Sequence, residues 1–155
     1  MSTTTINETT VQVYQVFIKA TPERIWEAIT KPEFTRQYFY GASVDSTVEV
    51  GSPWRYTGPD GFLWGDEIVL EADPPHKLVV GWRSLYDPDL ADEPASRITW
   101  EIQPQDGGFA HLTLVHDQLE QSPKTAASVS GMGWMMVLSG LKTLLETGKP
   151  LADES

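Results

Sequence analysis

Residues 122–148 read SPKTAASVSGMGWMMVLSGLKTLLETG, and this stretch decides which fold the sequence predicts. Ser122, followed by proline, suits the start of a helix, and Gly148 suits its end. Large apolar residues recur between them at helical spacing and form one stripe: Trp134, Leu138, Leu141 and Leu145. The stretch therefore predicts one long C-terminal helix with an apolar face.

The first half of this predicted helix differs in composition from the second. Residues 126–133 carry small side chains and one large flexible side chain, Met132. Small residues that face a strongly curved sheet leave volume unfilled, and native proteins pack too closely to leave such volume empty. We therefore expect a ligand cavity between the sheet and the first half of the helix.

A sheet is predicted from the middle of the chain, where β-branched and aromatic runs alternate with turns. Two short helices are expected after its first strand, beginning at Thr21-Pro22 and at Lys31-Pro32. Consecutive strands joined by tight turns favour an antiparallel meander over a parallel sheet. The expected strands are residues 11–19, 44–50, 53–57, 63–73, 78–85, 95–103 and 109–117.

Together these elements predict a two-layer α+β domain, in which a curved antiparallel sheet wraps around the long C-terminal helix. We expect one domain over residues 11–151, a disordered N-terminal tail at 1–10 and a C-terminal tail at 152–155. The acidic segment 86–94 is expected either to be a solvated connection or to act as a flap over the cavity mouth.

The composition excludes several classes of protein. The formal net charge is −11, which disfavours binding to nucleic acid or to an anionic membrane surface. The chain contains no cysteine, so disulfides, thiolate catalysis and cysteine-ligated metals are excluded. Its first residues lack the features of a signal peptide, and no apolar run is long enough for membrane insertion. We therefore expect a cytoplasmic protein.

Aromatic residues are the main candidates for a ligand-binding wall. The chain has six tryptophans, and each offers a large apolar body with one N–H group. A tryptophan on the inner face of a sheet can equally be plain core, so both interpretations stay open. The candidate ligand-binding residues are Phe39, Trp54, Trp64, Asp66, Trp82, Trp100, His116, Met132 and Met136.

Asp66 is the carboxylate that alternation places on the inner face of its strand. The set that contains Trp64, Asp66 and Ile68 is the more apolar one, so we expect it to face inward. A partly buried carboxylate there could act as a general acid or base. The alternative is a carboxylate at the rim, paired with Arg55 or Arg83.

His116 shares the inner face of the last strand with Leu112 and Leu114. It is expected to be a core or rim histidine bonded to the backbone, with ligand contact as the alternative. His111 and His116 point to opposite faces of that strand, and no metal-ligand spacing occurs elsewhere. We therefore predict no metal and no cofactor, and no catalytic residue is assigned.

Three motifs, in order, resemble the family named for the activator of the heat-shock protein 90 ATPase. They are residues 21–33 (TPERIWEAITKPE), residues 71–78 (EADPPHKL) followed by Trp82, and residues 133–148. The resemblance implies the START-like helix-grip fold, with a deep hydrophobic cavity. It also implies a choice of functions, because members bind lipids or other apolar molecules, some are cyclases, and the eukaryotic namesake is a co-chaperone.

Three functional hypotheses follow for this chain. The first is non-catalytic binding of a small hydrophobic or aromatic molecule in the internal cavity. The second is a polyketide cyclase/aromatase-like or hydrolase-type enzyme that uses Asp66 and His116 for acid–base chemistry. The third is a chaperone-related interaction protein whose acidic surface docks on a basic partner, with a homodimer as a further form of assembly.

Overall fold

The computed structural model describes residues 11–130 and 132–152, and the side chain of Met132 lies outside the described part. The expected N-terminal tail at 1–10 and residues 153–155 of the expected C-terminal tail also lie outside it. Within the described ranges, none of the helices has both the length and the apolar character needed to cross a membrane.

The described residues form a seven-stranded sheet: β1 Gln12–Ile18, β2 Ser43–Asp45, β3 Pro53–Thr57, β4 Leu63–Asp73, β5 Lys77–Trp82, β6 Ser96–Gln105 and β7 Phe109–Asp117. The strands lie in the order β1-β7-β6-β5-β4-β3-β2, and each neighbouring pair is antiparallel. The first strand therefore pairs with the last, which places Gln12 opposite His116. The predicted antiparallel sheet is confirmed.

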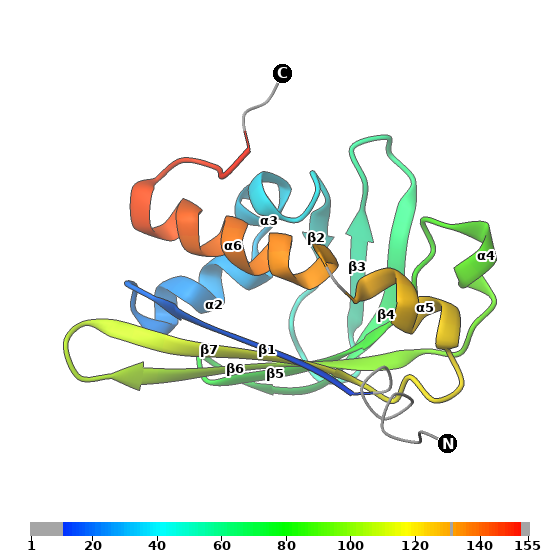
Figure 1. Cartoon of the computed structure of the whole chain (residues 1–155), viewed down its shortest axis with the longest axis horizontal. Coiled ribbons are helices and arrows are strands. Elements are labelled where there is room, and N and C mark those ends of the chain that lie inside the picture. The colour runs from blue at the N-terminus through cyan, green and yellow to red at the C-terminus, as the bar shows by residue number, and fades with distance from the viewer. Residues whose placement is uncertain (1–10, 131, 153–155) are drawn as a thin grey trace, which may run out of the picture.

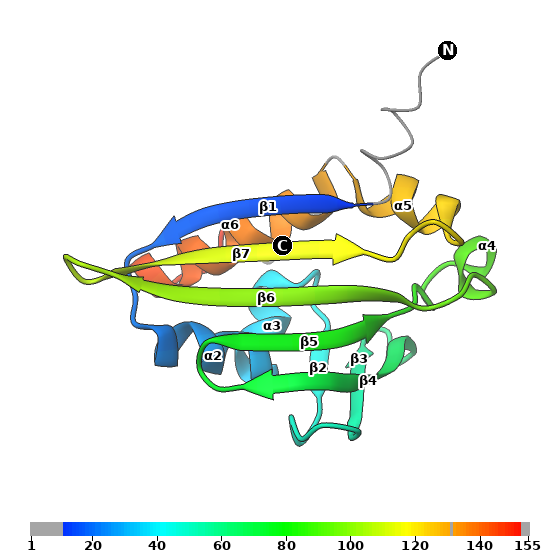
Figure 2. The same cartoon turned by 90° about the horizontal axis from the view of Figure 1, so that it is seen from below.

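The described residues also form helices α2 Pro22–Thr30, α3 Pro32–Tyr38, α4 Pro88–Ala91, α5 Pro123–Val129 and α6 Met132–Thr147, of which α4 lies beyond the end of the sheet (Figures 1 and 2). Figure 1 shows α6 lying along the concave face, with α2 and α3 beside it. Figure 2, seen from below, shows the strands in front and α6 behind them. A curved antiparallel sheet around a C-terminal helix, with two short helices after β1, is the helix-grip fold, and this prediction is confirmed.

Helix α2 begins and ends where the sequence predicts. The Thr21 hydroxyl oxygen accepts a hydrogen bond from the Arg24 backbone N–H at 3.2 Å, which satisfies a donor in the first helical turn. The helix ends before Lys31, which is extended because Pro32 follows it. Pro32 then occupies the first turn of α3. These signals are local in the sequence, although the helix also buries Ile25, Ala28 and Ile29 against the core.

The single long helix predicted from Ser122 is wrong, because the segment forms two helices. Helix α5 ends at Val129, and Ser130 is extended, with φ −70° and ψ 171°. The Ser130 hydroxyl donates to the Ala127 carbonyl at 3.0 Å, and such bonds to nearby backbone compete with helix continuation. The side chain of Ser122 does not cap α5, although the sequence suggested it, because the Ser122 hydroxyl donates to the Pro94 carbonyl at 2.7 Å.

Strand β4 faces the core through the opposite set of residues from the expected one. Val69 is 1% exposed, whereas Ile68 is 45% and Leu70 is 44% exposed. A bulge between Val69 and Glu71 then shifts the register, and Ala72 also packs against the core. In a bulged strand the side chains do not alternate regularly between the two faces of the sheet. Counting the apolar residues on each face of β4 therefore predicted the wrong face to be buried.

Three further boundaries differ from prediction. Strand β2 is shorter than 44–50, because Val48 has φ 63° and a left-handed residue interrupts a strand. Strand β5 ends at Trp82 instead of extending to residue 85. The segment 86–94 contains α4, which Asp87 caps through a hydrogen bond from the Asp89 N–H.

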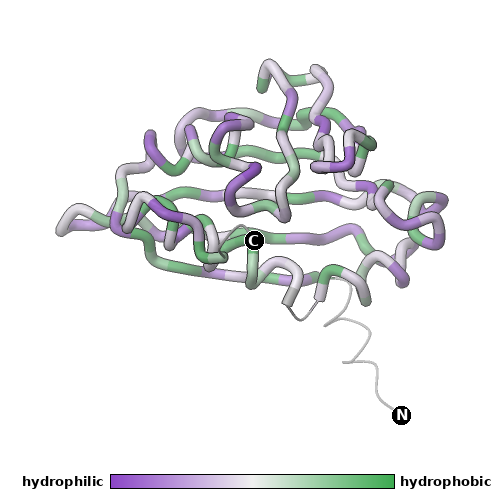
Figure 3. Tube along the Cα trace, turned by 90° about the horizontal axis from the view of Figure 1, so that it is seen from above, coloured by the Kyte–Doolittle hydropathy of each residue, from purple (hydrophilic) through white to green (hydrophobic). Residues whose placement is uncertain are grey.

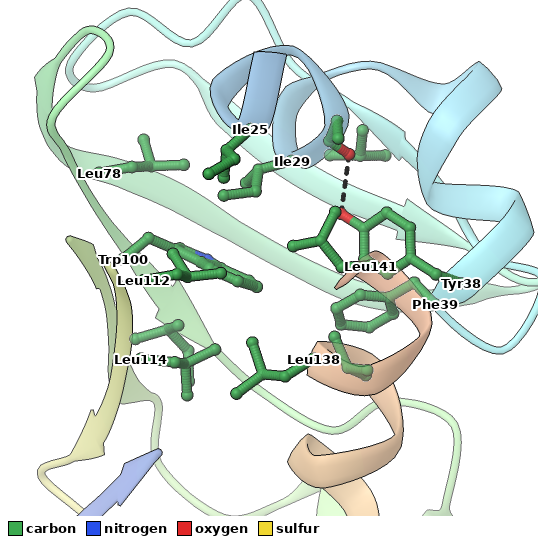
Figure 4. Close-up of a cluster of buried hydrophobic side chains, with 14 of the residues drawn as sticks. Ile25, Ile29, Tyr38, Phe39, Leu78, Trp100, Leu112, Leu114, Leu138 and Leu141 are labelled. Carbon is green, nitrogen blue, oxygen red and sulfur yellow. Dashed lines mark hydrogen bonds between the residues drawn. The ribbon is translucent and has the colours of Figure 1, made fainter. Parts of the chain in front are cut away.

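The core fills the space between the sheet, α2, α3 and the second half of α6. Figure 4 shows Ile25 and Ile29 of α2 facing strand residues such as Leu78, with Leu138 and Leu141 of α6 closing the cluster. The hydroxyl of buried Tyr38 donates to the Ala28 carbonyl at 2.7 Å (Figure 4). Figure 3 shows hydrophobic and hydrophilic residues alternating along strands and helices, as a one-sided core requires.

Replacing Leu141 with alanine should lower the free energy of unfolding by about 2–5 kcal/mol, because its side chain is fully buried and leaves a cavity. Urea denaturation followed by tryptophan fluorescence measures this loss. Met135→Ala is the matched control, since Met135 is 48% exposed on the same helix, and it should change stability by less than about 0.5 kcal/mol. Equal losses in the two variants would contradict this account of the core.

Candidate functional site

A pocket of about 500 Å³ lies between the β3–β5 part of the sheet and the start of α6. Its floor consists of four buried aromatic residues: Phe39, Tyr56, Trp82 and Trp134. Its rim consists of four more exposed residues: Tyr40, Asp60, Trp64 and Tyr86. Ser128, Val129, Gly133 and Val137 border it from α5 and α6. The pocket therefore opens to solvent at the rim and ends on aromatic rings.

The floor residues form one continuous ring cluster. Phe39 and Tyr56 stack with their ring centroids 4.5 Å apart. Trp82 and Trp134 meet edge to face at 5.3 Å, and Phe39 reaches Trp134 at 5.8 Å. Such contacts fix ring orientations as well as burying area. The floor is thus a rigid apolar surface built from β3, β5, α6 and the residue after α3.

A chain of hydrogen bonds beneath the floor holds both tryptophans. The Trp134 Nε1–H donates to His116 Nδ1 at 3.1 Å, so Nδ1 is an acceptor and carries no proton. The His116 Nε2 therefore carries the proton and donates to Ser96 Oγ at 2.7 Å. Ser96 Oγ in turn donates to the Trp82 carbonyl at 3.3 Å. His116 is therefore a core residue, as expected, but its ring is bonded to two side chains and not to the backbone. It is a positioning residue that joins α6 to the end of β5.

The surroundings of His116 keep its imidazole neutral. The residue is fully buried, and desolvation lowers its pKa to about 3, while the neighbouring Asp117 carboxylate opposes this to a smaller extent. A second proton would also turn Nδ1 into a donor and break the bond from Trp134. The neutral form is therefore the one compatible with the arrangement of the floor.

The rim is shaped by Trp64 and its neighbours. The indole of Trp64 lies directly over Gly58, where any Cβ atom would overlap it. The Tyr86 ring meets it at 6.3 Å, and the Tyr86 and Ser128 hydroxyls are 3.4 Å apart. The Tyr40 hydroxyl donates to the Gly133 carbonyl at 3.0 Å. Both rim tyrosines are thereby tied to the C-terminal helices.

Helix α5 is held against the rest of the molecule by Glu93. Its carboxylate accepts hydrogen bonds from the Lys124 N–H at 3.1 Å and from the Thr125 N–H and hydroxyl, both at 2.7 Å. These donors belong to the first turn of α5, where a carboxylate is favourable. The segment 86–94 thus contributes Tyr86 to the rim and, through Glu93, fixes the helix beside it.

The structure places the predicted candidate residues in different environments. Phe39, Trp64 and Trp82 line the pocket. Trp54, Trp100 and His116 are buried in the core next to it. Met136 is 37% exposed on α6, and the side chain of Met132 lies outside the described residues. The tryptophans therefore divide between pocket lining and core.

Asp66 does not face inward, and that expectation is wrong. It is exposed, and its Oδ1 accepts a hydrogen bond from Arg55 Nε at 2.9 Å, as the alternative proposed. The face assignment failed because β4 carries Val69, not Ile68, on the core side. Neither Asp66 nor His116 lines the pocket, so the pair proposed for acid–base chemistry does not meet there.

Nine of the twelve residues that line the pocket were absent from the candidates, and the sequence carried weak signals for some of them. Asp60 lies in the sequence Gly-Pro-Asp-Gly at residues 58–61, which is typical of a turn, and Tyr86 begins the acidic segment that could act as a flap. Tyr40 comes shortly after α3 and has φ 54°, which is unusual for a residue other than glycine. Its hydroxyl is bonded to the Gly133 carbonyl of α6. Tyr56 alternates with Trp54 on β3. Sequence alone does not place these turns beside one another.

Comparisons with known proteins agree with this geometry. Residues 19–146 match the family model described as Activator of Hsp90 ATPase homolog 1-like protein. No curated protein sequence matches the chain.

Solved structures show the same fold. A protein from Mesorhizobium loti is 24% identical with a TM-score of 0.73, over 88% of this chain and 96% of that one. The Aha1 dimer from Colwellia psychrerythraea is 19% identical with a TM-score of 0.70, over 90% of this chain and 98% of that one. DynU16, a protein of the dynemicin biosynthetic locus, is 23% identical with a TM-score of 0.74 over 91% of this chain, which spans only 49% of DynU16.

The contribution of His116 should make the protein less stable as pH falls below about 6.5. The unfolded histidine binds its proton near 6.5 and the folded one only near pH 3, so between these values the unfolded state binds more protons. The free energy of unfolding should fall by up to about 1.4 kcal/mol per pH unit in this window. Urea titrations at a series of pH values measure it.

The variant His116→Gln has no histidine at this position, so its free energy of unfolding should not show this acid-dependent loss. The natural protein should lose stability as pH falls from about 7 to about 4, and the difference in free energy of unfolding between the two proteins should therefore become smaller. His111→Gln is the control, because that ring is half-buried against Phe17 on the outer face of the sheet. It should keep the natural pH dependence. Parallel stability curves for the natural protein and His116→Gln would contradict the neutral, buried assignment.

Proposed function

We propose that this chain, which belongs to the Activator of Hsp90 ATPase homolog 1-like family, binds a small flat aromatic or apolar molecule in the pocket beside α6. The observation that carries the proposal is the floor of four buried aromatic rings. A volume of about 500 Å³ lies within the range of small-molecule sites, roughly 300–1,000 Å³. Planar ligands suit such a floor, because they can stack on fixed rings.

The small residues at the start of the C-terminal helices support the same proposal. Gly133 borders the pocket, and a Cβ atom there would meet only the Ser128 carbonyl at 3.7 Å. Space is therefore available beside the helix where larger side chains would otherwise fill it. Native packing favours the occupation of such a space by a ligand.

The polar groups of the floor favour binding over catalysis. Burial raises the pKa of the Tyr56 hydroxyl, which therefore stays protonated and uncharged. The proposed acid–base pair of Asp66 and His116 lies outside the lining. A neutral hydroxyl on an apolar floor orients a ligand, whereas proton transfer needs a group that titrates near the working pH.

Native mass spectrometry of freshly purified protein tests whether a molecule occupies the pocket. A reproducible additional mass of metabolite size is the expected result, and its mass identifies the class of ligand. Titration with acridine, a neutral planar probe, then tests the pocket in the ligand-free protein through quenching of tryptophan fluorescence. Trp64, Trp82 and Trp134 line the pocket and supply the signal.

Replacing Ser128 with tryptophan should weaken acridine binding at least about tenfold, equivalent to about 1.4 kcal/mol. Ser128 is exposed and borders the pocket, so a large side chain there can fill the mouth without disturbing the core. Ser139→Trp is the control, because Ser139 is exposed on α6 and does not line the pocket. Isothermal titration calorimetry measures both. Equal affinity in the two variants would show that acridine binds elsewhere.

A further inference from the structure

We infer that the rim of this pocket selects ligands that carry a positive charge, such as a protonated aromatic amine or a substituted ammonium group. The inference rests on the proposed function, because it concerns which aromatic molecules the same pocket prefers. It comes from three features of the described residues: the arrangement of the rim rings, an unpaired carboxylate beside them, and the absence of opposing cations in the lining.

The three rim rings have the arrangement of an aromatic cage. Trp64 and Tyr86 are 6.3 Å apart, with their planes inclined by 65°, so they form two walls of a corner. Tyr40 lines the same pocket mouth, where its hydroxyl donates to the Gly133 carbonyl. Ring faces carry partial negative charge and attract cations within about 6 Å. A cationic group at the mouth would therefore meet ring faces from more than one side.

The cage is organised before any ligand arrives. The Tyr40 hydroxyl is bonded to the Gly133 carbonyl, and the Tyr86 hydroxyl lies within 3.4 Å of the Ser128 hydroxyl. Gly58 lets the Trp64 indole lie flat on the turn at residues 58–61. Side chains that are already fixed lose little entropy on binding, which leaves more of the cation–π energy as affinity.

Asp60 supplies a full negative charge at the same mouth. Its Oδ1 accepts a hydrogen bond from the Phe62 N–H at 3.0 Å, which fixes the turn. Among the described residues it forms no ion pair, whereas the nearby carboxylate of Asp66 is paired with Arg55. A carboxylate that has no cationic partner beside an apolar pocket is free to pair with a charged ligand.

The charged residues around the pocket mouth are negative, as Asp60 is. None of the described lining residues is lysine or arginine, and Asp60 is the charged residue among them. The acidic segment that continues from Tyr86 adds four carboxylates: Asp87, Asp89, Asp92 and Glu93. With a formal charge of −11 over the whole chain, the field at the mouth attracts cations and repels anions. Fatty acids and phosphorylated ligands should therefore be disfavoured.

Three probes with one ring system test the inference. They are 9-aminoacridine, which is cationic at neutral pH, acridine, which is neutral, and acridine-9-carboxylate, which is anionic. Calorimetry at low salt should give roughly tenfold tighter binding for the cation than for acridine, and weaker binding for the anion. Added salt should reduce the preference, because the rim is exposed.

Asp60→Asn should reduce the affinity for 9-aminoacridine about threefold to fivefold and leave that for acridine unchanged. The turn should survive, since an amide oxygen can still accept from the Phe62 N–H. Asp60→Glu should keep part of the preference. Asp106→Asn is the control, because it makes the same change in net charge in the β6–β7 turn at the far end of the sheet (Figure 1).

The outcomes separate this inference from the proposed function. Equal binding of 9-aminoacridine and acridine, with both blocked by Ser128→Trp, overturns charge selection and leaves the pocket as an aromatic site. Equal weakening by Asp60→Asn and Asp106→Asn also overturns it, since overall charge then explains the preference. If acridine itself fails to bind, the proposed function fails, and charge selection fails with it.

Discussion

The hydrogen bond from Trp134 Nε1 to His116 Nδ1 is the interaction on which the functional part of the structure depends. It joins the first turn of α6 to the inner face of β7, and through Ser96 it reaches the end of β5. A buried tryptophan N–H without a partner would cost free energy, so the two residues fix each other. The hydrogen bond therefore helps to fix Trp134, and with it the floor of the pocket.

Two departures from regular structure accompany this docking. The extended residue Ser130 ends α5, so the chain beside the rim is two short segments and not one continuous helix. A bulge in β4 after Val69 changes the face that the strand presents to the core. The break at Ser130 follows Ser128 and Val129, which border the pocket, whereas the leucine-rich half of α6 packs in the core.

Part of the candidate site could be predicted from the sequence, and the reason for the rest is physical. Phe39, Trp64 and Trp82 were among the aromatic residues proposed for a ligand-binding wall, but the same reasoning also selected Trp54 and Trp100, which are core. Asp66 was placed on the wrong face because alternation assumes an unbroken strand. Asp60 and Tyr86 were missed because their neighbours come from separate turns, and no local pattern records which turns meet.

The sequence by itself determined the elements of this protein, because their signals are local. Thr21 and Pro22 begin a helix, and the turn at residues 58–61 reverses the chain. The leucine side chains of α6 form an apolar face, which must be buried against another element such as a sheet. Only the tertiary structure decided which tryptophans became core and which became pocket wall. That choice depends on bulges, helix breaks and buried hydrogen bonds, whose energies arise from contacts between residues far apart in the chain.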